Sequence, residues 1–156
     1  MARRRKKWRE RGTTTVEVAC VLPVFFAFMF AVFQFGHAQM VNSVLKGACR
    51  DASRFGATEG ITTQQVRDRV RQIVGTTIDP DKANILIKDA SAFEQDENLP
   101  QTESDYTAMP DIEVANAQRR QLILVRVSVA YNDIALSSLP FMHGAVLTGQ
   151  AFTRHE

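Results

Sequence analysis

The sequence predicts an α+β fold. A long N-terminal transmembrane helix continues into an amphipathic helix, which packs with a second helix on a small antiparallel sheet. Three observations support this prediction. Residues 18–33 form an apolar run without any charge, apolar residues then recur at three- and four-residue steps, and the C-terminal half holds short alternating runs. A chain of 156 residues has room for one such domain and its anchor.

The N-terminal leader, residues 1–12, is strongly basic. It holds seven of the 19 Lys and Arg residues and one of the 17 acidic residues. The remaining 12 basic and 16 acidic residues give the body of the chain a net charge of about −4. The overall charge of +2 therefore describes the leader, and we expect no nucleic-acid partner.

The apolar helix is expected over residues 13–36, long enough to cross a hydrocarbon core of roughly 30 Å. No Ala-x-Ala-like cleavage site follows it, so it should stay with the protein rather than act as a removable secretory signal. The basic leader predicts a cytoplasmic N-terminus and a domain, residues 37–156, on the other side of the membrane. Pro23 should kink this helix, because proline removes one helical hydrogen bond.

The helix is predicted to continue through residues 37–60 with one apolar stripe. Ala48, Ala52 and Gly56 form a ladder of small residues within it, which allows close helix packing. The ladder could face the sheet of the same molecule or another subunit. The residues of the stripe are Met40, Val41, Val44, Leu45, Ala48, Ala52 and Phe55.

The rest of the chain predicts a second helix and three strands. Thr62 and Gln65 resemble a capping box, and Gly75 is a plausible helix end. Residues 84–90, 120–134 and 145–156 contain the strand patterns. The acidic segment 91–118 lacks periodicity and is predicted to be a long loop.

Cysteine and histidine patterns indicate no metal or catalytic site. Cys20 and Cys49 lie 29 residues apart, about 40 Å along a continuous helix, and so cannot pair within one chain. An intermolecular disulfide through Cys49 remains open. The three histidines are scattered, without neighbouring ligands at metal-binding spacing. We therefore expect no enzyme activity, no metal and no cofactor.

One motif stands at the start of the apolar helix. The basic leader ends in Gly12, and Glu17 is the fifth residue after it. This order resembles the class III signal of type IV pilin-like proteins. The resemblance implies cleavage between Gly12 and Thr13 by a membrane prepilin peptidase. It also implies that the carboxylate of Glu17 brings subunits into register during assembly.

Further motifs narrow the resemblance to the TadE-like family, the pseudopilins of Tad/Flp tight-adherence pilus systems. Residues 10–58 carry it, with Val18 in place of a usual aromatic residue and Gln34 in place of a frequent acid. The resemblance implies a membrane-anchored minor subunit or assembly factor of the pilus, whose partners are other pilin or pseudopilin subunits and the Tad assembly machinery. The matching motifs are Val16-Glu17-Val18, Leu22-Pro23, Gln34-Phe35-Gly36 and the small-residue helix Gly47 to Ala57.

A second interpretation of Glu17 needs no cleavage. Thr14 and Glu17 have the spacing of a capping box, and the helix dipole favours a carboxylate in a first turn. The chain would then be an unprocessed single-pass protein whose external domain is a structural or partner-binding module. A third class, a membrane-anchored enzyme, predicts activity in residues 37–156.

Overall fold

The computed structural model describes residues 4–94, 100, 102–135 and 144–156, with the backbone alone for residues 4–14 and 94. The chain divides into two compact units, Met1–His37 and Ala38–Glu156. Helix α1, Arg4–Gly56, contributes residues to both. Each unit is described separately below.

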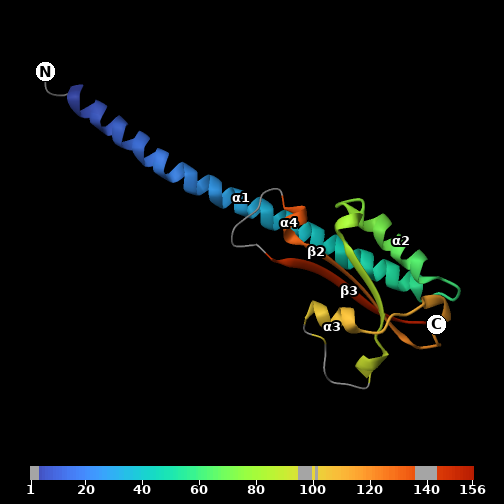
Figure 1. Cartoon of the computed structure of the whole chain (residues 1–156). Coiled ribbons are helices and arrows are strands. Elements are labelled where there is room, and N and C mark those ends of the chain that lie inside the picture. Colours follow the sequence, from blue (N-terminus) through green and yellow to red (C-terminus); the bar gives the residue numbers. More distant parts are fainter. Residues whose placement is uncertain (1–3, 95–99, 101, 136–143) are drawn as a thin grey trace. The chain divides into compact units, whose positions relative to one another are not determined.

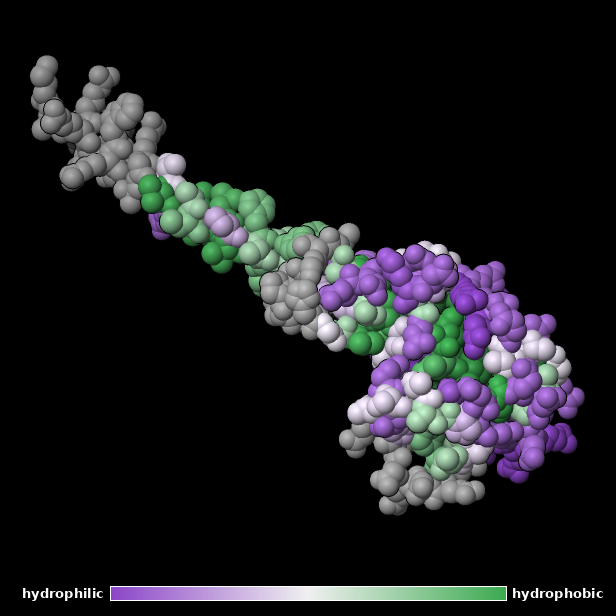
Figure 2. All heavy atoms as spheres, viewed as in Figure 1, coloured by the Kyte–Doolittle hydropathy of each residue, from purple (hydrophilic) through white to green (hydrophobic). Residues whose placement is uncertain are grey.

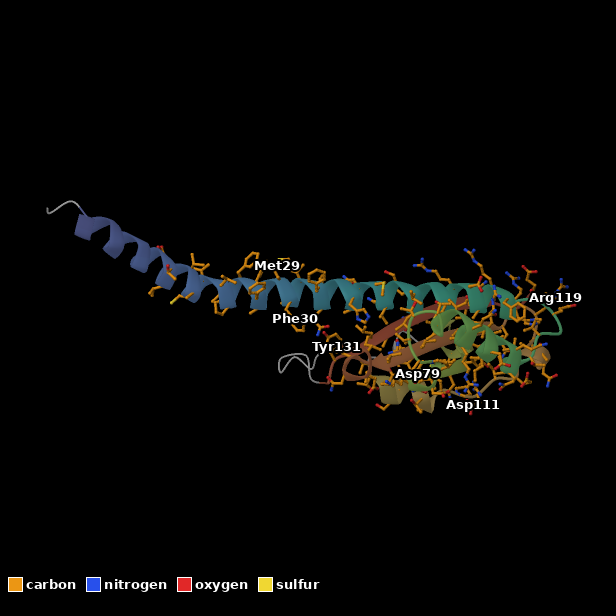
Figure 3. The ribbon with its side chains drawn as sticks, turned by 90° about the horizontal axis from the view of Figure 1, so that it is seen from above. Met29, Phe30, Asp79, Asp111, Arg119 and Tyr131 are labelled. Atoms are coloured by element: carbon orange, nitrogen blue, oxygen red, sulfur yellow. The ribbon has the colours of Figure 1, made fainter. Side chains whose placement is uncertain are left out.

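The first unit is an apolar helix. Among the described residues, α1 is the one helix long and apolar enough to cross a membrane. Over residues 15–30 every side chain is exposed, and Met29 and Phe30 lie on different sides of the ribbon in Figure 3. Val24, Phe28 and Phe33 are each at least 65% exposed. Hydrophobic residues likewise cover the surface of this part of α1 in Figure 2. A helix that is apolar all round requires an apolar environment.

The second unit is built on a three-stranded antiparallel sheet with helices on both of its faces (Figure 1). The strands β1, β2 and β3 lie in chain order, and β2 is central. The C-terminal part of α1 and helix α2 cover one face of the sheet, while α3 lies over the other. The elements after α1 are α2 Thr63–Val74, η1 Pro80–Lys82, β1 Asn84–Asp89, η2 Ser91–Glu94, α3 Glu103–Ala108, η3 Val114–Asn116, β2 Leu122–Ala130, α4 Tyr131–Ile134 and β3 Val146–Arg154.

The core fills the space between the helices and one face of the sheet. Val41, Leu45 and Cys49 of α1 are fully buried there. Strand β2 contributes every second residue, because alternate side chains point to the same face. The β2 residues of this face are Ile123, Val125, Val127 and Val129, and α2 adds Val66, Val70 and Val74.

Helix α2 begins and ends where its sequence predicts. The side chain of Thr62 accepts a hydrogen bond from the Gln65 N–H, and Gln65 Oε1 accepts one from the Thr62 N–H at 2.8 Å. This reciprocal capping box supplies partners for two N–H groups at the start of α2 that lack partners within the helix. Gly75 follows the last helical residue.

The predicted α+β class is confirmed: an N-terminal apolar helix is followed by helices and a small antiparallel sheet. Two details of the prediction were wrong. Met40 and Phe55, assigned to the buried stripe of α1, are 50% and 38% exposed. The stripe instead includes Cys49, because a straight helix turns 100° per residue, which puts Cys49 only about 40° from Leu45 around the axis and Met40 about 140° from it.

The segment 91–118 is also more structured than the loop expected from its sequence. Its described residues include η2, α3 and η3, and it makes a bridge from Asp111 to Lys88 of β1. The sequence lacks helical periodicity because these elements are only three to six residues long. Residues 95–99 and 101 lie outside the described residues.

Candidate processing and assembly segment

The predicted processing site lies inside a helix. Helix α1 begins at Arg4 and continues through Gly12 and Thr13. A capping box at Thr14 and Glu17 would require the helix to start at Thr14, because an N-cap residue has non-helical backbone angles. The interpretation of Glu17 as a cap in the intact chain is therefore wrong.

Glu17 lies on the exposed surface of α1 among apolar side chains. Glu17, Val21 and Phe25 follow one another at four-residue steps and so share one side of the helix. With Val18 and Leu22 they border a shallow groove. Glu17 makes no hydrogen bond or ion pair with another described residue. Glu17 is also the one charged residue between Arg11 and Lys46. The residues that border this groove with Glu17 are all apolar, so they offer its carboxylate no hydrogen bond.

Pro23 does not interrupt α1, whose helical assignment is unbroken from Arg4 to Gly56. A proline inside a helix leaves the carbonyl four residues before it, here that of Ala19, without its usual N–H donor. Membrane helices tolerate this loss when neighbouring groups or a local adjustment compensate. The kink at Pro23 stays a prediction.

The ladder of small residues lies in the core of the second unit. Ala48 and Ala52 are fully buried. A Cβ added to Gly56 would meet the Cγ2 of Val66 at 2.9 Å, so Gly56 admits α2 to close contact with α1. These three residues face their own domain, and another subunit has no access to them while the domain is folded.

Gly149 of β3 is a packing residue that sequence analysis missed. A Cβ on it would lie 2.5 Å from the carbonyl carbon of Leu45 and 2.7 Å from the nitrogen of Lys46. The backbone of β3 therefore rests directly on the backbone of α1. No local pattern could have identified this glycine, because the contact joins residues 104 positions apart.

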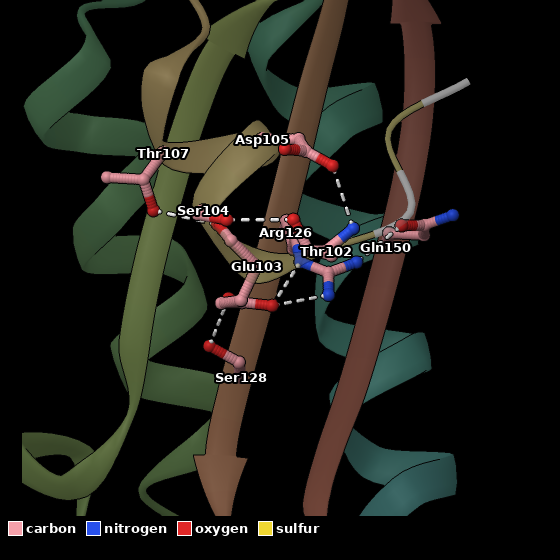
Figure 4. A network of polar contacts seen from close by, with 8 residues as sticks. All are labelled: Thr102, Glu103, Ser104, Asp105, Thr107, Arg126, Ser128 and Gln150. Carbon is pink, nitrogen blue, oxygen red and sulfur yellow. Dashed lines mark hydrogen bonds and ion pairs between the residues drawn. The ribbon is translucent and has the colours of Figure 1, made fainter. Parts of the chain in front are cut away.

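A second feature missed from the sequence is a polar cluster on the other face of the sheet (Figure 4). Arg126 is 8% exposed, and its Nη2 donates to Glu103 Oε2 of α3 at 2.6 Å. Its Nη1 donates to Gln150 Oε1 at 2.7 Å, and its guanidinium lies 3.9 Å from the centroid of the Tyr106 ring. Ser128 Oγ donates to the other oxygen of Glu103 at 2.9 Å. The cluster fixes α3 on the sheet.

Three of the described ionisable groups in this unit have shifted pKa values. The hydrogen bond from Arg126 lowers the pKa of Glu103, and the bond from Ser128 adds to this effect. Burial raises the pKa of Asp89, but hydrogen bonds from Ser91 and Gln121 outweigh it and lower the net value. Burial raises the pKa of the Cys49 thiol to about 12. Cys49 is thus an unreactive core residue while the domain is folded.

The titratable residues that the structure describes form no recognisable metal site. Within the described parts of the chain, no three His, Cys, Asp or Glu side chains group closely enough to hold an ion. His155 is 5% exposed, and both of its ring nitrogens lack a hydrogen-bond partner among the residues described. His143 lies outside the described residues.

An N-terminal helix that is apolar all round, followed by a folded α+β unit, is the arrangement of a single-pass membrane protein. Comparison with known families refines this class. Residues 12–54 match the sequence model of the family described as TadE-like protein, so this part of the chain is similar to that family. The resemblance expected from the sequence motifs is thereby confirmed. Comparisons with curated proteins and with solved structures gave no match.

Proposed function

We propose that this protein is a TadE-like pseudopilin, a membrane-anchored minor subunit or assembly factor in the biogenesis of a Tad/Flp pilus. One observation carries the proposal. The family match begins at Gly12, and a single carboxylate, Glu17, follows five residues later on an otherwise apolar helix. The proposed role is structural, without catalysis. The major Flp subunits of such systems are much smaller than this chain of 156 residues, which argues for a minor subunit.

Cleavage between Gly12 and Thr13 would change the chemistry around Glu17. In the intact chain, Glu17 lies in the middle of a helix that begins at Arg4. After cleavage it would lie in the first turn of the new helix, near a free ammonium group on Thr13. Helical side chains point back toward the N-terminus, and residues four apart share a face. The carboxylate can therefore reach its own amine or that of a neighbour.

This pairing would give assembly a driving force. A carboxylate at the centre of a membrane helix costs about 2.5–3.5 kcal/mol on insertion scales, and less near the interface. An ammonium partner and the positive end of the helix dipole both lower that cost. A filament in which each Glu17 meets an amine would be more stable than the isolated subunit. The remaining helix, residues 13–36, would be about 36 Å long, enough to span the membrane.

The proposed orientation places the N-terminus in the cytoplasm and residues 37–156 outside the bacterial cytoplasmic membrane. The seven basic residues of the leader support this orientation by the positive-inside rule. It also places the Gly12–Thr13 bond on the cytoplasmic side, where the prepilin peptidase would cut. The domain would then be free to meet other pilin or pseudopilin subunits outside the membrane.

Mass spectrometry of the membrane-extracted protein tests the cleavage. In cells with an active prepilin peptidase, we expect the mass of residues 13–156. A Gly12→Leu variant should keep the intact mass, because the resemblance implies a glycine before the cut. Gly36→Ala is a matched control on the same helix, since a Cβ there meets nothing within 4 Å. An intact N-terminus on the wild-type protein would overturn the cleavage claim and favour the unprocessed single-pass protein.

A rearranged pair of residues tests the role of Glu17. The double variant Glu17→Val with Val18→Glu keeps the composition and hydropathy of the helix but moves the carboxylate about 100° around its axis. We expect normal membrane levels and processing with loss of pilus assembly. Assembly at wild-type levels would mean that the position of the carboxylate does not matter, which excludes a register role.

A further inference from the structure

The outer edge of β3 presents backbone hydrogen-bonding groups that lack a backbone partner among the described residues. β3 pairs with β2 through all nine of its residues, without a bulge. The bonds at the ends of this ladder run from the Tyr131 N–H to the Ala145 oxygen and from the His155 N–H to the Gln121 oxygen. Odd-numbered residues of β3 therefore bond to β2, and the backbone groups of the even-numbered residues point outward. Within the described part of the chain, the outward groups of Val146, Thr148, Gln150 and Phe152 have no backbone partner.

The two edges of the sheet differ. The outer edge of β1 is partly covered, because Asp89 N–H donates to the Pro110 oxygen and Lys88 pairs with Asp111. Proteins usually protect a free edge with proline, lysine or a bulge. The β3 sequence, VLTGQAFTR, contains neither proline nor lysine. This edge is therefore a suitable template for another strand.

An open groove of about 610 Å³ runs along this edge. Its lining comes from both sides of the sheet: Asn42, Lys46 and Arg50 of α1 on one side, and Tyr106 and Arg126 on the other. Between them lie β3 residues, among them Val146, Thr148 and Gln150, whose backbone groups point outward. A groove with these walls passes over the edge of β3 rather than over a face of the sheet.

The groove has a surplus of positive charge. Lys46 and Arg50 are exposed and make no ion pair with a described residue. The described lining contains no carboxylate. Arg126 already shares its charge with Glu103, whose two oxygens are occupied by Arg126 and Ser128. Among the described residues, Lys46 and Arg50 are thus two cations without an ion-pair partner beside a strand edge without a paired strand.

The spacing of these cations suits an extended chain. Residues four apart on a helix are separated by about 6 Å along its axis. Alternate side chains on one face of a strand are about 6.6 Å apart. We propose that the β3 edge binds an extended acidic segment of a partner protein, which adds a fourth strand to the sheet. Two carboxylates at alternate positions of that segment pair with Lys46 and Arg50.

A synthetic peptide tests the proposal on the full chain in a nonionic detergent. The probe is a fluorescein-labelled peptide of sequence STEVEISG, titrated to millimolar protein and followed by anisotropy. We expect saturable binding that weakens with added salt, as a contact between exposed charges should. A peptide with both glutamates replaced by glutamine should bind at least fivefold more weakly. A version with N-methyl groups on its pairing edge should not bind, because it cannot donate to β3.

Charge reversal on the protein provides the matched comparison. The double variant Lys46→Glu with Arg50→Glu should weaken binding at least tenfold. Arg67→Glu with Arg71→Glu, a pair of the same spacing on α2, should change it by less than twofold. Equal effects of the two double variants would overturn the proposal, since the binding would then depend on net charge alone.

Amide hydrogen exchange identifies the bound edge. In the saturated complex, exchange should slow at least fivefold at the Thr148 and Gln150 amides, whereas odd-numbered amides of β3 are protected from the start. Binding without this protection would overturn the proposal. If these two amides are protected in the free chain and the protection rises with protein concentration, a second copy binds the edge. If they are protected at every concentration, the chain covers its own edge. Either result would also overturn it. The test does not depend on cleavage after Gly12.

Discussion

The contact between Gly149 and α1 makes a quantitative prediction about stability. An added Cβ would lie 2.5 Å from the Leu45 carbonyl carbon and 2.6 Å from its oxygen, whereas ordinary contact begins near 3.4 Å. Both partners are backbone, so neither can rotate away. In Gly149→Ala, β3 and α1 must therefore separate by about 1 Å.

The cost follows from the contacts that this separation weakens. A gap of 0.5–1 Å loses about a quarter to a half of the dispersion energy of each affected contact. Leu45 and Ala48 of α1, both fully buried, face the sheet near this point. Overpacking of this kind costs about 1–3 kcal/mol, occasionally more. We expect Gly149→Ala to lose about 3 kcal/mol, a large part of a total stability of order 5–15 kcal/mol.

Cys49 provides the assay. The thiol is fully buried, and the other cysteine, Cys20, is exposed, so in a Cys20→Ala background labelling reports the opening of the core. Pulse labelling over a urea series in nonionic detergent gives the free energy of unfolding. Gly47→Ala is the control, because Gly47 lies two residues from Leu45 and a Cβ there meets nothing within 4 Å. The control should gain about 0.5–1 kcal/mol from helix propensity.

The result that would refute this reasoning is a Gly149→Ala protein within about 0.5 kcal/mol of its parent, with Gly47→Ala stabilised as expected. The core would then tolerate the added methyl group without separation of β3 and α1. The close contact would not contribute to the stability of the domain.

Three further predictions concern single groups. Because its pKa is lowered by Arg126, Glu103 stabilises the fold fully above its ordinary pKa, and this contribution is lost as the pH falls through the lower folded value. Acid titration of unfolding should therefore show a shallower loss below pH 4.5 in Glu103→Gln, which at pH 7 is about 1–2 kcal/mol less stable. Thr62→Ala should cost about 1 kcal/mol in urea unfolding through loss of the α2 cap, and an unchanged midpoint would contradict the capping role. Cys49 should form no intermolecular disulfide under oxidising, non-denaturing conditions, and a Cys49-dependent dimer on a nonreducing gel would contradict its burial.

The sequence predicted those parts of the fold that depend on local pattern. Alternation puts Ile123 and Val125 on one face of β2, and the spacing of Val66 and Val70 puts both on one side of α2. The structure shows that both pairs are buried in the core. The alternation of β2 could not show that Arg126 would be buried, because its partner Glu103 belongs to a segment without periodicity. Such contacts depend on the tertiary arrangement.

The candidate segment was predictable in a different sense. The order Gly12, Glu17 and Leu22-Pro23 is a linear motif, so the order of residues along the chain is enough to reveal it. The structure added that Glu17 lies inside a helix in the intact chain. This result depends on knowing that α1 begins at Arg4. The cap-like spacing of Thr14 and Glu17 would instead place the start of the helix after Thr14.

The close contact between Gly149 and the backbone of Leu45 also constrains the order in which the protein can fold. The helix that contributes Val41 and Leu45 to the core is made first, and the strand that covers it is made about a hundred residues later. Long separations of this kind slow folding, because a large loop must close before the contact forms. Until β3 is made, the backbone of α1 around Leu45 lacks the strand that contacts it in the folded domain. A chaperone that shields this part of α1 would thus act in the interval between synthesis of the first and last elements of the core.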